Sequence, residues 1–335
     1  MRNKYKILFV GVAIVFAATM HGVTQSFNEF ATFTTGSGAL SIVTGPDGAM
    51  WFTESTANKI GRAVTAGNDK IVSVTGAVVF QEYTIPTASS TPYGIAVGPD
   101  KALWFTEYSG NKIGRITTAG VITEYSVPTV GSGPLYITTG PDGNLWFTET
   151  NGNNIGRITT AGVITEYAIP TASSTPTGIT AGPDNALWFA ENLNTGNKIG
   201  RISTSGSITE YSTPTSNSVP FGITAGTDGA LWFTEQGVNN IGRITTSGVI
   251  TEYPIFGGSN PRQIIVGPDG ALWFTMQFST PSPNYYFIGR FAPSDGASAF
   301  YRVPTPGCGP NGLTIGPDRA IWLTECGIGQ FTLPK

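Results

Sequence analysis

Histidine is nearly absent from this sequence, and cysteine is scarce. The 335 residues include one histidine and two cysteines, and the histidine, His21, lies close to the N-terminus. The rest of the chain therefore has no Ser-His-Asp triad and no histidine general base. Zinc would also lack its usual nitrogen and sulfur ligands. Any proton transfer would depend on a carboxylate, a lysine or a tyrosine.

Charged residues are few as well, at 12% of the chain, and no basic run or phosphate-cradling glycine loop occurs. Three of the 18 basic residues, Arg2, Lys4 and Lys6, stand in residues 1–26, which contain no acidic residue. The remaining 15 basic residues face 21 acidic ones, a net charge of −6. An acidic chain without a basic patch is a poor candidate for nucleic acid binding.

Residues 1–26 are predicted to be an export signal peptide. The basic start is followed by an apolar core from Ile7 to Ala18 and then by small or polar residues. This core is shorter than the roughly 20 residues that a membrane-spanning helix needs; an uncleaved anchor is the alternative. Removal of the signal would leave residues 27–335 secreted or periplasmic, with no membrane span.

Repetition is what the sequence has in quantity. The phrase Gly-Pro-Asp-Gly-Asn-Leu-Trp-Phe-Thr-Glu at residues 140–149 recurs, with variations, seven times. It carries all seven tryptophans, Trp51, Trp104, Trp146, Trp188, Trp232, Trp273 and Trp322. Their spacings of 53, 42, 42, 44, 41 and 49 residues indicate a repeat architecture with a period of about 42 residues.

One repeat predicts four short strands, a to d, at residues 136–139, 145–149, 155–159 and 163–167. Gly-Pro-Asp-Gly at 140–143 forms a tight turn between a and b, and Ala161-Gly162 turns the chain between c and d. No segment shows helical apolar periodicity. Four antiparallel strands repeated seven times predict an all-β, seven-bladed β-propeller that occupies residues 27–335 as a single domain.

The two ends of the chain predict how the ring closes. The last repeat stops without its strand d, and residues Phe27 to Phe30 match the strand-d pattern of Thr165-Glu166-Tyr167. We expect this N-terminal strand to pair with residues 328–333 and to remove the exposed edge.

Charged residues recur in the c–d hairpins. If Ala161-Gly162 is the centre of the turn, Arg157 lies opposite Glu166, which predicts a structural ion pair across the strands. The same arithmetic pairs Arg115 with Glu124, Arg201 with Glu210, Arg243 with Glu252 and, at the closure, Gln330 with Glu29.

Strand b ends in a glutamate in six repeats. These carboxylates could form an acidic collar for Mg²⁺, Ca²⁺ or a cationic ligand. Alternatively, each caps its own hairpin loop through backbone N–H groups or the neighbouring Lys59, Lys112 or Lys198. The turn aspartates are interpreted as turn residues, not as a calcium motif. The six glutamates are Glu54, Glu107, Glu149, Glu191, Glu235 and Glu325.

One position in each d–a loop varies among the repeats, although its surroundings are nearly identical. In a propeller it should line the mouth of the central channel, so we interpret it as ligand-contacting, with neutral drift as the alternative. The residues are Leu40, Tyr93, Leu135, Thr177, Phe221, Arg262 and Asn311, and the candidate ligand contacts among them are Tyr93, Phe221, Arg262 and Asn311. The long b–c loop Gln277–Phe287 is a candidate lid or a tolerated insertion.

Cys308 and Cys326 suit a disulfide in an exported protein. They flank the predicted hairpin of the last repeat, which places them at the same end of one blade.

The phrase at residues 226–235, followed by Asn240-Ile241-Gly242-Arg243-Ile244 and Ile250-Thr251-Glu252-Tyr253, resembles the virginiamycin B (streptogramin B) lyase family. The resemblance covers residues 27–335. It implies a Mg²⁺-dependent elimination that opens a cyclic depsipeptide at its ester bond. It also implies a histidine base in a Pro-His-Gly of the last blade, a second histidine in the preceding blade, a tyrosine in the first blade and metal-binding glutamates.

Matched residue by residue, this sequence departs from that site. The base falls at Asn311, the second histidine at Arg262 and the tyrosine at Leu40, while Gly309 replaces an expected acidic residue. Glu325 alone resembles a metal-binding carboxylate. An asparagine cannot abstract a proton, so the residues argue against the reaction that the resemblance implies.

The sequence therefore predicts an exported, monomeric, non-catalytic propeller that binds a small molecule or a peptide at its loop face. The alternative is an enzyme, either a divergent lyase or a carboxylate-based hydrolase, that uses Glu325 and a divalent metal such as Mg²⁺. A purely structural envelope protein is a third interpretation. An enzyme should show a cluster of non-repeated acidic residues at the channel mouth, and the acidic residues here are repeated ones.

Overall fold

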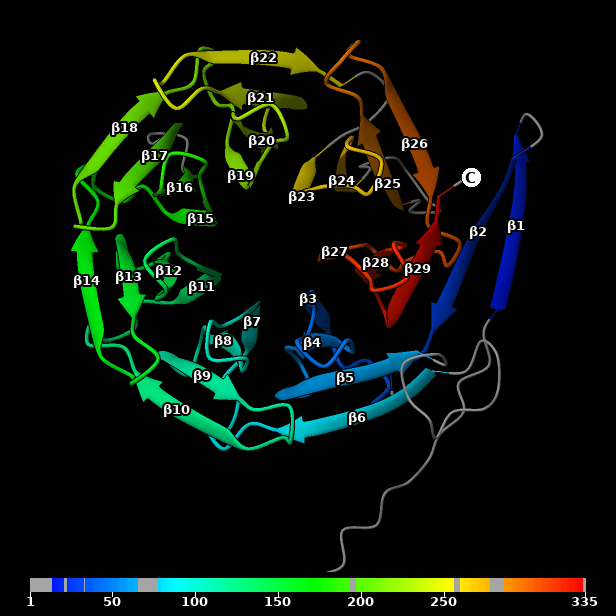
Figure 1. The fold of residues 1–335 in the computed structure, drawn as a ribbon, viewed down its shortest axis with the longest axis horizontal. Helices are drawn as coiled ribbons and strands as arrows, with labels where there is room; N and C mark the ends of the chain where they lie inside the picture. The colour runs from blue at the N-terminus through cyan, green and yellow to red at the C-terminus, as the bar shows by residue number, and fades with distance from the viewer. Residues whose placement is uncertain are drawn as a thin grey trace, which may run out of the picture.

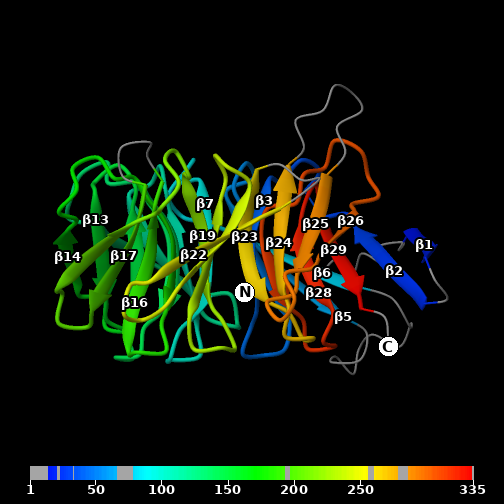
Figure 2. The same cartoon turned by 90° about the horizontal axis from the view of Figure 1, so that it is seen from above.

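Short antiparallel strands account for all regular structure in the part of the chain that the computed structural model describes, residues 14–20, 23–32, 34–65, 78–192, 197–255, 260–277 and 286–333. They form seven sheets that stand as blades around a central axis (Figure 1). Figure 2 shows the same ring from the side. The predicted all-β, seven-bladed propeller is confirmed. Among the described residues there is no helix with the length and apolarity of a membrane span.

Each blade runs from strand a, nearest the axis, to strand d at the rim. Blade 1 consists of β3 (Ala39–Thr44), β4 (Met50–Glu54), β5 (Lys59–Thr65) and β6 (Val78–Thr84). Blade 2 consists of β7 (Pro92–Val97), β8 (Leu103–Glu107), β9 (Lys112–Ile116) and β10 (Ile122–Ser126). Blade 3 consists of β11 (Pro134–Thr139), β12 (Leu145–Glu149), β13 (Asn154–Ile158) and β14 (Ile164–Ala168).

The other four blades repeat this order. Blade 4 consists of β15 (Pro176–Ala181), β16 (Ala186–Glu191), β17 (Lys198–Ser203) and β18 (Ile208–Ser212), and blade 5 of β19 (Pro220–Ala225), β20 (Leu231–Glu235), β21 (Asn240–Ile244) and β22 (Ile250–Pro254). Blade 6 consists of β23 (Pro261–Val266), β24 (Leu272–Gln277), β25 (Tyr286–Phe291) and β26 (Ser298–Arg302). Blade 7 consists of β27 (Leu313–Ile315), β28 (Ile321–Thr324) and β29 (Ile328–Thr332), completed by β2 (Val23–Phe30).

Strand b is the buried centre of each blade. Leu145, Trp146 and Phe147 in β12 have no exposed surface, and they pack on both faces of the sheet. Gly156 in β13 makes room for the Phe147 ring, because a Cβ there would lie 2.2 Å from it. The apolar run of strand b and the glycine of strand c therefore build one core layer together.

The ring closes as the sequence predicts. β2 pairs with β29 in antiparallel fashion, and Phe27 lies opposite Phe331. Asn28, not Glu29, faces Gln330, and its Nδ2 donates to Gln330 Oε1 at 2.8 Å. A further strand, β1 (Ile14–Met20), pairs with β2, so this sheet has five strands. β1 and the start of β2 lie within the segment expected to be the export signal.

The predicted arginine–glutamate pairs of the c–d hairpins are wrong. Arg157 lies opposite Thr165, and Glu166 lies opposite Gly156. The turn holds an odd number of residues, closed by Thr159 and Val163, so the register differs by one residue from a two-residue turn. Because side chains alternate along a strand, this places the arginine and the glutamate on opposite faces. The predictions for Arg115, Arg201 and Arg243 fail in the same way.

The arginines bind the turn aspartates instead. Asp142 accepts from Trp146 Nε1 at 2.9 Å and from Arg157 Nε at 3.0 Å, and the Arg157 guanidinium lies 5.8 Å from the Trp146 ring centroid. The indole–aspartate hydrogen bond occurs in all seven blades. We call this group the turn-face triad. In the last blade Gln330 takes the place of the arginine and donates to Asp318.

Candidate functional site

A bulge in strand a sets the direction of the side chains at the axis. In β11, Pro134 lies opposite Glu149 and Ile137 opposite Phe147, so Leu135 and Tyr136 share one partner, Thr148. The same register shift occurs in β3, β7, β15, β19 and β23. Two consecutive side chains at the bulge can therefore be redirected at the loop end of each blade.

A threonine of strand b holds this bulge and links neighbouring blades. Thr106 Oγ1 accepts from Gly94 N at 2.9 Å and donates to Leu135 O of the next blade at 2.7 Å. Thr53, Thr234, Thr275 and Thr324 make the equivalent donation to the next blade's carbonyl. The backbone at the variable loop position is therefore fixed whatever its side chain is. That position can diverge without loss of the ring.

Aromatic side chains nearly fill the axial channel. The Tyr136 ring packs edge-on against Tyr93 and Phe221, with centroid distances of 5.2 Å and 5.9 Å. The Arg262 guanidinium lies 4.9 Å from the Phe221 centroid. The space that remains is a cavity of about 10 Å³, the axial cavity, lined by Leu40, Tyr93, Tyr136, Phe221, Arg262, Gln263 and Asn311.

Five of the seven variable positions thus line the axial cavity, including the four candidate contacts Tyr93, Phe221, Arg262 and Asn311. Leu135 is not among the lining residues, and neither is Thr177. The Thr177 hydroxyl donates to Phe221 O at 3.0 Å and so replaces the strand-b threonine, because blade 4 has Ala190 there.

The analysis of the sequence missed Tyr136 and Gln263. Both occupy the second bulge position, where four blades have glycine. A Cβ at Gly94 would lie 2.7 Å from Leu135 O, so a side chain needs extra space at this point. A residue other than glycine at the second bulge position was the signal that could have found them.

A much larger cavity, about 740 Å³, lies where the last blade meets the first, and we call it the seam cavity. Its walls come from the end of β2, the loop to β3, the 305–311 loop and the turn after β28, elements far apart in sequence that adjoin at the closure (Figure 1). The lining is largely apolar or small, with Phe30, Leu40 and the Cys308–Cys326 disulfide. Glu29, Asn311 and Glu325 supply polar groups.

Glu325 differs from the other strand-b glutamates. Glu54, Glu107, Glu149, Glu191 and Glu235 are completely buried, whereas Glu325 keeps 6% exposure and lines the seam cavity. Within the described residues neither carboxyl oxygen of Glu325 has a hydrogen-bond partner, but Glu54, Glu107, Glu191 and Glu235 share this property, so the contact with the cavity is what sets Glu325 apart. Burial, and then the negative charge of Glu29, raise the pKa of Glu325 to about 8. The group is therefore largely neutral at neutral pH.

The disulfide explains part of this difference. In the first five blades a buried serine hydroxyl beside the glutamate lowers the glutamate's pKa, against the larger effect of burial. In the loop before the last blade, Cys308-Gly309-Pro310 replaces Ser132-Gly133-Pro134 of blade 3. Because Cys308 is bonded to Cys326, Glu325 loses a serine neighbour and faces a cavity instead.

Neither predicted role of the repeated glutamates is right. They form no acidic collar, because none of them lines the axial cavity and only Glu325 lines the seam cavity. The lysines do not cap them either: Lys59, Lys112 and Lys198 pair with the strand-d glutamates Glu82, Glu124 and Glu210. The turn aspartates hold turns, as predicted, and also bind tryptophan and arginine.

The residues at the seam do not fit a magnesium site. Mg²⁺ needs near-octahedral oxygen ligands, usually with one or two free carboxylates. Glu29 already accepts hydrogen bonds from Thr305 N at 3.0 Å and from Thr305 Oγ1. Gly309 offers no side chain, and Glu325 alone remains. No group of three potential metal ligands occurs among the described residues. Residues 278–285 of the candidate lid lie outside those residues.

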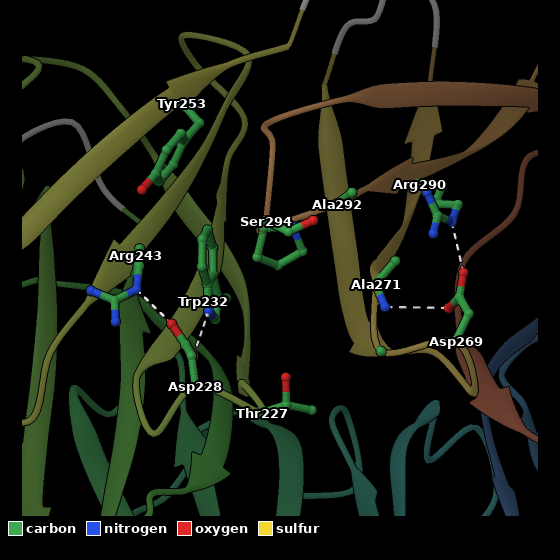
Figure 3. A pocket seen from close by; sticks show the side chains of 12 residues that line it. Thr227, Asp228, Trp232, Arg243, Tyr253, Asp269, Ala271, Arg290, Ala292 and Ser294 are labelled. Atoms are coloured by element: carbon green, nitrogen blue, oxygen red, sulfur yellow. Dashed lines mark hydrogen bonds and ion pairs between the residues drawn. The ribbon is translucent and has the colours of Figure 1, made fainter.

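A second cavity, of about 360 Å³, lies on the opposite face between blades 5 and 6, and Figure 3 shows its lining. In four other seams a Cβ on the hairpin glycine would meet a tyrosine of the preceding blade, as it would at Gly162 with Tyr125, but a Cβ on Gly296 in blade 6 would meet no described atom within 4 Å. Both arginines of this turn-face cavity are paired, Arg243 with Asp228 and Arg290 with Asp269, each at 2.7 Å.

Comparisons with known proteins agree with the fold. Residues 17–195 and 192–333 match the model of the Virginiamycin B lyase family. Selenomethionine-substituted virginiamycin B lyase from Staphylococcus aureus is 40% identical, with 92% of this chain and 99% of that chain covered and a TM-score of 0.81.

Two further structures are similar to the same extent. A streptogramin B lyase is 38% identical over 92% of this chain and 98% of that chain, with a TM-score of 0.81. A catalytically inactive virginiamycin B lyase from Staphylococcus aureus with Quinupristin is 40% identical over 92% and 99%, with a TM-score of 0.82. This chain therefore belongs to the virginiamycin B lyase family.

Proposed function

We propose that this protein is an exported propeller that binds a small molecule or a peptide at its loop face and does not catalyse a reaction on it. The observation that carries this proposal is the seam cavity of about 740 Å³, which has apolar walls and a few polar groups. Ligand sites in proteins are typically concave, mainly apolar and of this volume.

The chemistry of Asn311 and Arg262 supports binding over catalysis. These residues stand where the family resemblance puts two histidines. The Asn311 amide donates weakly to Ala39 O at 3.3 Å and to Gly309 O at 3.4 Å, and an amide has no basic lone pair with which to take a proton. A guanidinium has only N–H donors and no acceptor, so Arg262 cannot serve as the base.

Export is part of the proposal. It rests on the basic start and apolar core of residues 1–26, and the Cys308–Cys326 disulfide is consistent with an oxidising compartment. We propose that residues 27–335 act as one monomeric domain in the periplasm or outside the cell.

Glu325 favours one alternative, a divergent lyase. A carboxyl group with a pKa of about 8 lies in the range useful for a general base. As a carboxylate it could remove a proton from the carbon adjacent to the one that bears the ester oxygen, on the alcohol side of the ester of a cyclic depsipeptide. A carbon–carbon double bond would then form, and the ester C–O bond would break to release a carboxylate.

Mass spectrometry separates the two functions. Purified protein is incubated with quinupristin, with and without Mg²⁺, and the mass and fragmentation of the antibiotic are followed. We expect the cyclic form to persist. Ring opening that disappears in Glu325→Gln would establish the lyase and refute the non-catalytic proposal.

Binding itself is measured with the neutral fluorophore phenylnaphthylamine. Its emission should rise with the wild-type protein. It should not rise with Ala31→Trp, since Ala31 is an exposed residue of the seam cavity wall, where an indole would fill the space. Equal fluorescence with both proteins would show that the cavity is not the binding site.

A further inference from the structure

We infer that the ligand of the seam cavity carries an oxyanion, a carboxylate or a sulfonate, on an apolar body, and that Arg262 binds this oxyanion. The inference rests on the proposed binding function and names the chemical class of the ligand.

Arg262 differs from most of the cations in the part of the chain that the structure describes. Six arginines pair with turn aspartates and three lysines with strand-d glutamates. Lys101 and Arg319 are exposed in turns. Arg262 is half-buried near the axis, and the described residues provide no carboxylate within ion-pair distance of it. A half-buried guanidinium without a counterion is a ready partner for an anion.

The surroundings of Arg262 hold its guanidinium in place. Arg262 O accepts from Thr234 Oγ1 at 2.6 Å, which fixes the backbone. The Phe221 ring centroid lies 4.9 Å from the guanidinium, and Tyr136 packs against the same ring in a T-shaped arrangement. An aromatic face orients the planar group while leaving its N–H donors free for an oxyanion.

The seam cavity and the cavity that Arg262 lines share two wall residues. Leu40 and Asn311 line both the seam cavity and the axial cavity, and Arg262 lines the axial cavity. A ligand whose apolar body lies in the seam cavity can therefore direct one end past Leu40 and Asn311 toward the guanidinium. The axial cavity of about 10 Å³ holds about one water molecule, so the oxyanion would meet the guanidinium at the edge of this cavity and not inside it.

The two acidic residues of the seam cavity place only one negative charge, that of Glu29, beside an anionic ligand. Glu29 is engaged by Thr305, and burial keeps Glu325 largely protonated at neutral pH. The turn-face cavity makes a useful contrast, because both of its arginines already have aspartate partners. Of the two larger cavities, only the seam cavity adjoins an arginine without such a partner in the described chain.

Two fluorophores with the same apolar skeleton test the inference: anilinonaphthalene sulfonate, which is anionic, and phenylnaphthylamine, which is neutral. The affinity of each is measured by fluorescence titration of the full chain at neutral pH. We expect the sulfonate to bind more tightly, and Arg262→Gln to weaken it about tenfold or more while phenylnaphthylamine is unaffected. Arg262→Lys, which keeps the charge but not the planar fork, should give an intermediate loss.

Arg319→Gln is the matched control, because it removes one positive charge from an exposed turn on the opposite face. It should change neither affinity. If phenylnaphthylamine binds and Arg262→Gln leaves the sulfonate affinity unchanged, or weakens both probes equally, the oxyanion inference is wrong and the binding function stands. If neither probe binds to the wild-type protein, the proposed binding function fails, and the inference fails with it.

Discussion

The turn face and the loop face of the ring use the repeat in opposite ways. On the turn face, an aspartate binds the tryptophan indole in every blade, and six blades add the same arginine. On the loop face, the variable position holds six residue types in seven blades, and the serine of five loops is replaced by Cys308 before the last blade. Residues that repeat in the blades therefore build the ring, and residues that differ between blades line the seam cavity and the axial cavity. Each prediction below would break or sharpen this division.

The largest effect is expected from Trp146→Ala on the turn face. The indole is fully buried, and its loss also removes a partner from Asp142 and Arg157. We expect a loss of about 3–5 kcal/mol in the free energy of unfolding, measured by chemical denaturation. Binding of phenylnaphthylamine should be unchanged while the protein is folded. Trp146→Phe, which keeps most of the volume, is the milder control, and lost binding in either folded variant would contradict the division.

The disulfide tests the loop face next. The double variant with Cys308→Ser and Cys326→Ala removes the disulfide, which joins two residues 18 positions apart. The free energy of unfolding should fall by about 3 kcal/mol. Cys308→Ala combined with Cys326→Ala is the matched control. The serine variant should be the more stable of the two by about 1 kcal/mol, because a hydroxyl again stands beside Glu325. Equal stability would show that the missing serine is not what distinguishes Glu325.

The repeated glutamates predict a dependence of stability on pH. Burial raises the pKa of Glu149 to about 8 from its ordinary value of 4.5. Below about pH 4.5 both the folded and unfolded chains hold this proton, and its stabilising contribution is complete. As the pH rises toward 8, Glu149 ionises in the unfolded chain before it ionises in the folded one. This lowers the free energy of the unfolded chain, so stability falls and the contribution is lost.

The unfolding midpoint should therefore decrease between about pH 5 and pH 9. Glu149→Gln, which keeps an uncharged group in the same volume, should show a smaller decrease than the wild type. Glu107 and Glu191, with pKa values raised in the same way, would retain the rest of the dependence. Parallel curves for the variant and the wild type would mean that Glu149 does not titrate in this range.

The sequence was sufficient for the architecture because architecture is what the repeat encodes. The tryptophan period predicted the blades, and the unmatched strand at Phe27–Phe30 predicted the closure. The prediction from sequence failed where a shift of one residue in the strand register decides which side chains meet. Because the turn has an odd number of residues, Arg157 does not lie opposite Glu166 as predicted and pairs with Asp142 instead. A count of residues between two strands cannot show whether the turn closes around two residues or three.

The same limitation hid part of the candidate site. The comparison of repeats followed a single position, whereas the bulge gives two consecutive residues to the axis, so Tyr136 and Gln263 were missed. The position of Arg262 on Phe221 and the shared walls of the two cavities depend on packing between blades that are distant in sequence. No local pattern contains that information.

The smallest effect concerns Thr177, the variable residue whose role is in the ring and not in the cavity. Its hydroxyl supplies Phe221 O with the hydrogen bond that Thr106 supplies to Leu135 O in blade 2. Thr177→Val should therefore cost about 1 kcal/mol, as much as Thr106→Val, in denaturant unfolding. Ala190→Thr should add little to the wild type but should rescue Thr177→Val, because it restores the donor from strand b.

This double-mutant cycle decides where the boundary between scaffold and site lies. A positive coupling between positions 177 and 190 would assign Thr177 to the scaffold and leave the cavity to the residues that line it. If Thr177→Val does not change the stability, and Ala190→Thr has the same effect on stability with and without it, the inter-blade hydrogen bond in blade 4 contributes nothing to stability. Divergence at Thr177 would then need the same explanation as divergence at Tyr93 or Phe221. The loop-face site would have to extend beyond the residues that line the two cavities.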